Sequence, residues 1–122
     1  MTDVGKNQLL KLFHNPSCSK SRAVFELLQN AQKEFCLVEY LNNPPEKEEI
    51  ALLIELLDEP ADKLVRKKEE LFLKMAIPEN ELTPSLVEDL IERHPILMER
   101  PVVMTEQKAV ICRPPIKVFD LL

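Results

Sequence analysis

Residues 9–30 read LLKLFHNPSCSKSRAVFELLQN, and this stretch decides the fold. Residues 9–13 are mostly apolar and have the length of a short buried strand. The polar, proline-containing segment 14–17 ends that strand. The stretch predicts a strand, a tight turn and an amphipathic helix that starts near Cys18. Apolar residues then recur at the helical spacing i, i+3, i+4 and i+7: Val24, Leu27, Leu28 and Ala31.

Three further strands are predicted outside this stretch. Residues 35–40, FCLVEY, form a strand apolar enough to be covered on both faces, which would place Cys36 in the core. A strand, a helix and a second strand in this order imply a parallel pair with a right-handed crossover. Residues 102–105 and 109–112 flank a polar EQK segment and predict a hairpin, before a terminal helix that starts at 114–115.

A helical block, residues 46–94, separates the two halves. Asn43 can cap its first helix, with Pro44 at the first helical position. Thr83 and Pro84 give the same signal for a later helix. The order β-α-β, helices, β-β-α predicts an α/β fold with a small mixed four-stranded sheet. Without a repeat or a linker, we expect one domain over residues 1–122.

Composition excludes several classes of function. The net charge is −5, there is no tryptophan and no basic stripe, so we expect no nucleic-acid partner. No apolar run approaches the roughly 18 residues of a membrane span. The start of the chain also has no apolar signal segment, so we expect a cytoplasmic protein without a membrane partner.

Glycine is nearly absent, while proline is abundant. The chain has one glycine, Gly5, and ten prolines. The G-x-G-x-x-G, P-loop and G-x-S-x-G motifs all need glycine and are therefore excluded. An anion would have to be held by side chains and a helix N-terminus.

Cysteine and histidine usage points to reduced thiols. Three cysteines are an odd number, unsuited to a disulfide framework. Two histidines without C-x-x-C or H-E-x-x-H spacing make a metal site unexpected. We expect Cys112 to be structural, as we do Cys36.

Cys18 is the candidate reactive residue. At the first turn of a helix, free N–H groups and the helix dipole favour a thiolate over a thiol. His14, Lys20 and Arg22 add nearby positive charge. The hydroxyl of Ser21, three residues on, can point back at the sulfur. The alternative is that Cys18 is a small packed residue at a turn.

The segment HNPSCSKSR, residues 14–22, resembles the active-site loop of the glutaredoxin-coupled arsenate reductases, the ArsC family. Further matches are VRK at 65–67, HPILMERPVV at 94–103 and CRPPIKVFDLL at 112–122. Together they cover the chain from residue 9 to its end. The chain looks especially like a short arsenate reductase-like branch with C-S-K-S in the loop.

The resemblance implies a thioredoxin-like fold with residues 46–94 as its helical insert. It implies that Cys18 is the nucleophile, that His14 helps to hold the thiolate, and that Ser21 hydrogen-bonds to it. Pro101 matches a cis-proline that faces the cysteine. Three arginines match those that cradle the oxyanion: Arg66, Arg100 and Arg113.

Arginine suits an arsenate site because its planar fork is always charged and makes two parallel hydrogen bonds. Arg100 and Arg113 flank the predicted hairpin, so both can reach one face. Arg66 begins a charged run, residues 66–70, and a solvated surface charge is an equally good interpretation there.

The implied activity is arsenate reduction to arsenite, as in bacterial arsenic detoxification. The Cys18 thiolate would attack an arginine-held arsenate or similar oxyanion. Because Ser21 stands where C-x-x-C has its second cysteine, the reducing thiol must come from outside. In the family it comes from glutathione with glutaredoxin. We expect no bound cofactor and a monomer.

Three rival functions stay open. An Spx-like regulator shares the fold and binds RNA polymerase, but typically has C-x-x-C and lacks the H-N-P loop, so Ser21 and His14 count against it. The chain could also be a glutathione-dependent thiol reductase for another substrate, because an oxyanion cradle and a reactive cysteine do not identify the central atom of the substrate. An inactive binding module would have an ordinary Cys18 thiol.

Overall fold

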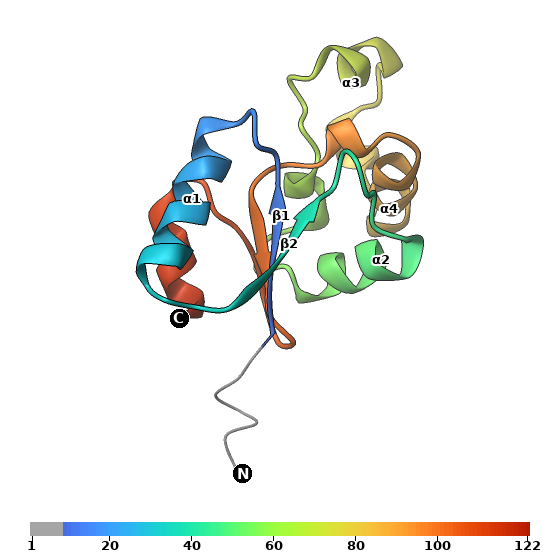
Figure 1. Cartoon of the computed structure of the whole chain (residues 1–122). Helices are drawn as coiled ribbons and strands as arrows, with labels where there is room; N and C mark the ends of the chain where they lie inside the picture. The colour runs from blue at the N-terminus through green and yellow to red at the C-terminus, as the bar shows by residue number, and fades with distance from the viewer. Residues whose placement is uncertain (1–8) are drawn as a thin grey trace.

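The computed structural model describes residues 9–122, which form a four-stranded sheet with helices on both faces (Figure 1). The strand order is β2-β1-β3-β4. β1 pairs with β2 in parallel and with β3 antiparallel, and β3 pairs antiparallel with β4. The mixed sheet is therefore confirmed. The strands are β1 (Leu10–His14), β2 (Phe35–Glu39), β3 (Val102–Met104) and β4 (Ala109–Ile111).

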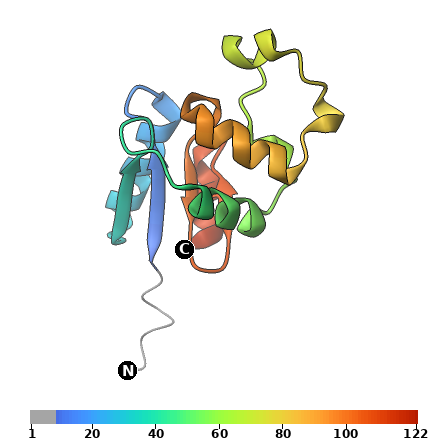
Figure 2. The same cartoon turned by 90° about the vertical axis from the view of Figure 1, so that its right-hand side faces the viewer.

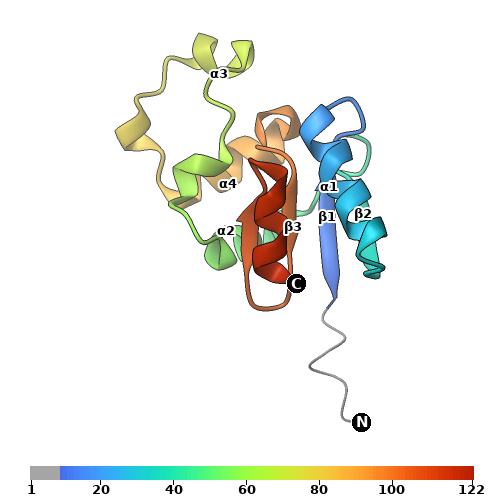
Figure 3. The same ribbon diagram turned by 90° about the vertical axis from the view of Figure 1, so that its left-hand side faces the viewer.

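Two sets of helices cover the sheet. α1 (Ser19–Asn30) and the 3₁₀ helix η5 (Pro115–Leu121) lie against one face (Figure 3). α2 (Lys47–Leu56) and α4 (Pro84–Arg93) pack together on the other (Figure 2). The remaining helical pieces are η2 (Ala61–Leu64), α3 (Glu70–Met75), η3 (Glu79–Glu81) and η4 (Pro95–Leu97). In residues 9–122 no helix is both long and apolar enough to span a bilayer.

Each face of the sheet has its own apolar core. The smaller core joins Val24 and Leu28 of α1 to Val103 and Val110 of the hairpin. The larger core lies beneath α2 and α4. It contains Phe13, Ile50, Leu53, Val87, Ile91 and Val102, among others. Burial of these side chains on both faces fixes the sheet between the two helical layers.

The prediction that β2 is covered on both faces is wrong. β2 is an edge strand, and Cys36 and Leu37, on opposite faces of it, are both exposed. An apolar run indicates burial only where neighbouring elements cover it, and here β1, β3 and the other edge strand, β4, are covered while β2 is left open. Cys36 is therefore a surface thiol and not a core residue.

The helix starts follow the predictions in one case and not in another. α4 begins at Pro84, and the Leu86 N–H donates to Thr83 Oγ1 at 3.2 Å, which confirms the predicted cap. α2 begins only at Lys47, so Asn43 does not cap it. The reason is that Pro45 follows Pro44, and a residue before proline avoids helical backbone angles.

Candidate active site

Cys18 lies between the end of β1 and the start of α1. It is the N-cap residue of α1, in extended conformation with φ −97° and ψ 122°, and its N–H donates to the Asn15 carbonyl oxygen at 2.9 Å. The Asn15 side chain fixes the same turn, because its Oδ1 accepts from the Ser17 N–H at 2.9 Å. This turn presents the sulfur to the N–H groups of the first helical turn, which have no partners within the helix.

The surroundings of Cys18 favour the thiolate. Burial alone would raise the pKa of the thiol, but hydrogen bonds from the N–H groups of Ser21 and Lys20, the charge of Arg100 and a contact with Arg113 lower it more. The net result is that the pKa of Cys18 lies below its ordinary value. A thiolate is the nucleophilic form of cysteine.

Ser21 supports the loop in a way that the sequence did not predict. Its hydroxyl lies 2.6 Å from His14 Nδ1 and accepts from the Asn15 N–H at 3.0 Å. The hydroxyl of Ser21 therefore bonds to His14 and Asn15, and it is the Ser21 N–H that acts on the sulfur. His14 and Ser21 are both buried, so this pair ties the end of β1 to the start of α1.

His14 does not supply the positive charge that was expected of it. Burial lowers its pKa below 6.5, against the opposing effect of the Glu39 carboxylate and with help from the Arg22 charge. The imidazole is therefore neutral at neutral pH. Its contact with Ser21 makes it a support for the cysteine loop.

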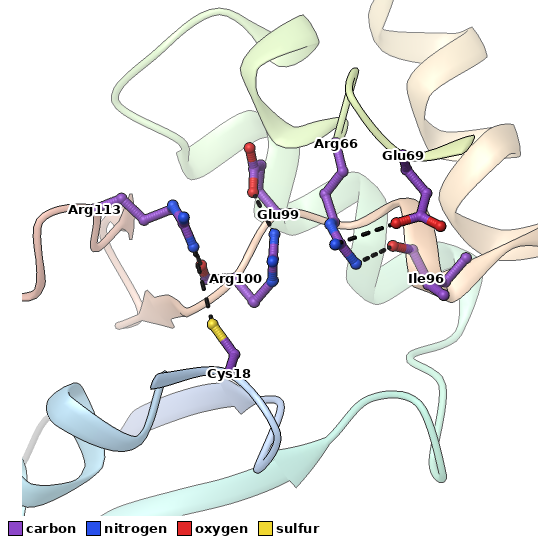
Figure 4. Close-up of polar contacts among 7 residues, drawn as sticks. All are labelled: Cys18, Arg66, Glu69, Ile96, Glu99, Arg100 and Arg113. Atoms are coloured by element: carbon purple, nitrogen blue, oxygen red, sulfur yellow. Dashed lines mark hydrogen bonds and ion pairs between the residues drawn. The ribbon is translucent and has the colours of Figure 1, made fainter. Parts of the chain in front are cut away.

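Two arginines lie close to the sulfur (Figure 4). Arg113 Nη1 is 4.0 Å from Cys18 Sγ and also donates to the Arg100 carbonyl oxygen at 2.9 Å. Arg100 precedes β3 and Arg113 follows β4, and these ends are adjacent in the antiparallel hairpin. Both arginines precede cis peptide bonds, Arg100–Pro101 and Arg113–Pro114; the first agrees with the cis-proline expected at Pro101.

Arg66 reaches the same region from the helical block. A single antiparallel bridge joins Val65 to Met98, and the Arg66 N–H donates to the Leu97 carbonyl oxygen at 2.7 Å. These bonds hold the backbone of Arg66 next to the segment that leads into Arg100. Its side chain points to Glu69 and to the Ile96 carbonyl oxygen, however, and away from Cys18 (Figure 4).

Two carboxylates pair with the cradle arginines, and neither was predicted from the sequence. Glu69 lies 3.2 Å from Arg66 Nη2, and Glu99 lies 3.2 Å from Arg100 Nη1. The available signal was local: Glu69 is three residues after Arg66, and Glu99 adjoins Arg100. An incoming anion must compete with these carboxylates for the guanidinium groups.

The arginines line a cavity of about 430 Å³. Six of its lining side chains are cationic and two are anionic, so a positive pocket lies on a chain of net charge −5. Cys18 does not line the cavity itself, but its sulfur contacts Arg113, which does. The lining residues are Lys63, Val65, Arg66, Lys67, Lys68, Glu69, Glu99, Arg100 and Arg113.

The other two cysteines are unlike Cys18. Cys112 is fully buried, and burial raises the pKa of its thiol to about 12. Cys36 lies opposite Lys11 in the parallel register of β1 and β2, away from the strand end that leads to Cys18. Neither shares the charged surroundings that activate the sulfur of Cys18.

Comparison with known proteins decides the family. Residues 13–120 match the ArsC family. The chain belongs to this family. Among curated relatives, this ArsC chain is 34% identical over 113 residues to the arsenate reductase of Acidiphilium multivorum, covering 93% of this chain and 80% of that protein. It is also 34% identical over 114 residues to the uncharacterised protein YfgD of Escherichia coli strain K12, covering 93% and 96%.

The fold comparison agrees with the ArsC assignment. The solved arsenate reductase from Vibrio cholerae superimposes with a TM-score of 0.86 at 32% identity, covering 94% of this chain and 98% of that one. The ArsC chain therefore has the thioredoxin-like fold of its structural neighbours, and it is arsenate reductase-like, with Cys18 beside arginines.

Proposed function

We propose that this ArsC-family chain reduces arsenate to arsenite, with Cys18 as the nucleophile and glutathione with glutaredoxin as the reductant. The observation that carries the proposal is the sulfur of Cys18 at the N-terminus of α1, 4.0 Å from a guanidinium nitrogen of Arg113. A thiolate and a fixed cation at this distance can hold and attack the same tetrahedral oxyanion.

The cradle is proposed to assemble in two stages. Arg113 and Arg100 already lie around the sulfur, so they make the first contacts with the anion. Arg66 joins after its guanidinium leaves Glu69. Arginine suits this exchange because its charge does not titrate and its planar fork can bind two oxygens at once.

The proposed reaction balances with two external thiols. The Cys18 thiolate forms a sulfur–arsenic bond, and one arsenate oxygen leaves as water after it takes up protons. A glutathione thiolate then attacks the Cys18 sulfur, forms a mixed disulfide and leaves the electron pair of the broken bond on arsenic, which goes from As(V) to As(III). A second thiol, supplied through glutaredoxin, reduces the mixed disulfide. Such chemistry needs the reduced thiols of the cytoplasm.

The roles of the loop residues complete the proposal. Ser21 and His14 hold the turn in which Cys18 lies, because their mutual hydrogen bond fixes the N-terminus of α1 to β1. Pro101 leads the chain from Arg100 into β3. None of the three needs to touch the arsenic.

The test is arsenate-dependent NADPH oxidation in the presence of glutathione, glutaredoxin and glutathione reductase. We expect turnover in the natural chain, none above background in Cys18→Ser, and full turnover in Cys36→Ser, since Cys36 is exposed on the edge strand. Full turnover in Cys18→Ser, or none in the natural chain, would refute the proposal.

The size of the cavity favours one second candidate. A volume of about 430 Å³ lies in the range of pockets that take a whole small molecule, about 300–1,000 Å³. A glutathione-dependent reductase for a larger anionic substrate would use the same Cys18 and the same arginines. Cys18-dependent glutathione consumption with a larger anion, at higher kcat/KM than with arsenate, would establish this candidate.

A further inference from the structure

Tyr40 is a buried polar residue that the proposed reaction does not yet use. It follows β2 directly, and its side chain is 0% exposed. It belongs to the larger core, with Phe13 of β1 and with Leu97 and Met98, the segment that leads into Arg100. Its hydroxyl has no hydrogen-bond partner within residues 9–122. Buried hydroxyls are normally paired, so this one needs an explanation.

Arg100 also has a buried polar atom without a hydrogen-bond partner among the described residues. Its Nε is buried and likewise has no partner in the described part of the chain. A guanidinium N–H can only donate a hydrogen bond, whereas a phenol oxygen can accept one. The two buried groups are therefore complementary as donor and acceptor.

Charged and polar groups of the site act on the Tyr40 hydroxyl. Burial raises the pKa of its hydroxyl, so the phenol stays neutral at neutral pH. Arg100 opposes this increase most, followed by the Asn15 amide and by Arg66. Asn15 approaches the hydroxyl without forming a well-shaped hydrogen bond. Groups of both the cysteine loop and the arginine cradle therefore act on the Tyr40 hydroxyl, which is buried in the core that also contains Leu97 and Met98.

We propose that Tyr40 is a positioning residue whose hydroxyl oxygen accepts a hydrogen bond from Arg100 Nε–H when an oxyanion draws the Arg100 guanidinium away from Glu99. The inference rests on the oxyanion binding of the proposed function, but not on turnover. Tyr40 Oη and Arg100 Nε are both sealed from solvent, so Tyr40 does not touch the anion itself. Its bond would fix the plane of the guanidinium, and so the direction of the N–H groups that bind oxygen.

The chain offers a direct spectroscopic test, because it contains one tyrosine and no tryptophan. The tyrosine absorbance band and tyrosine fluorescence therefore report Tyr40 alone. Titration with inorganic phosphate or arsenate is expected to give a saturable tyrosine difference spectrum. Arg100→Lys should abolish this response, because the three N–H groups of lysine all lie on its terminal nitrogen and none replaces the Nε–H of arginine.

Tyr40→Phe tests the role in binding. It removes only the hydroxyl, so we expect the phosphate Kd and the arsenate KM to rise about tenfold, with kcat within about twofold. The Tm without anion should not fall, since the lost hydroxyl has no partner there. Val87→Ala is the packing control: Val87 lies in the same core on α4, so its loss lowers the Tm but leaves the KM unchanged.

The outcomes separate this inference from the proposed function. A tyrosine response to phosphate without arsenate reduction supports Tyr40 and refutes the reductase. Arsenate reduction with no tyrosine response, or with an unchanged KM in Tyr40→Phe, overturns the role of Tyr40. No binding of either anion overturns both. If Tyr40→Phe does not fold, the tyrosine difference spectra of the natural chain and of Arg100→Lys still show whether Tyr40 responds to the anion through Arg100.

Discussion

Replacement of Arg113 by glutamine tests whether the cradle also activates the sulfur. The variant removes a cation whose Nη1 lies 4.0 Å from Cys18 Sγ. At this distance two unit charges interact by about 1 kcal/mol in water and by about 4 kcal/mol at the effective dielectric constant of a protein surface. Cys18 is half-buried, so we take the lower figure as the minimum loss of thiolate stabilisation.

The assay is the pH dependence of Cys18 alkylation by iodoacetamide, with thiolate absorbance as a second readout. In Arg113→Gln the midpoint should move to higher pH, since the thiolate loses a favourable charge and the pKa of Cys18 rises. Cys36→Ser in the background removes the other exposed thiol, and Cys112 stays unreactive because it is buried.

Two further variants make this test specific. Arg113→Lys keeps the charge and should keep most of the alkylation profile, while it loses oxyanion affinity with the planar fork. Arg22→Gln should leave the midpoint in place, because Arg22 donates to the Pro16 carbonyl oxygen and, against the expectation from the sequence, is not among the groups that lower the pKa of Cys18. A profile of Arg113→Gln that superimposes on that of the natural chain refutes the reasoning.

Two other predictions follow from the charges around the site. Glu99→Gln removes the carboxylate that competes with the anion for Arg100. The KM for arsenate should therefore fall about two- to fivefold, as expected for an ion pair worth about 0.5–1 kcal/mol. Glu70→Gln is the control: Glu70 is in an exposed pair with Lys74, so the KM should not change. Burial lowers the pKa of His14, so below pH 6.5 the unfolded chain binds a proton that the folded chain does not. The free energy of unfolding should therefore fall as the pH drops below 6.5. Urea titrations at a series of pH values should show a shallower fall in His14→Gln. An arsenate KM that rises in Glu99→Gln, or an unchanged pH slope in His14→Gln, would contradict them.

Local sequence patterns predicted much of the secondary structure, because strand, turn and helix signals depend on residues that are close together in the chain. Residues 9–30 carry their own strand, turn and helix signals, and the structure places Cys18 at the N-terminus of that helix as expected. The Thr83 cap and the hairpin at residues 102–111 were likewise set by neighbours in sequence. The positions of Arg66, Arg100 and Arg113 came from the resemblance to the family.

What the sequence by itself determined was therefore the order of the elements and the placement of a cysteine at a helix start. Only the tertiary structure decided which groups are covered and which are paired. Cys36 is exposed because β2 lies at the edge, and His14 is neutral because it is buried. Tyr40 and Arg100, far apart in the chain, each keep a buried polar atom without a partner in the described residues, and the Arg100 charge acts on the Tyr40 hydroxyl. Burial and charge depend on neighbours in space, and periodicity along a chain does not record those neighbours.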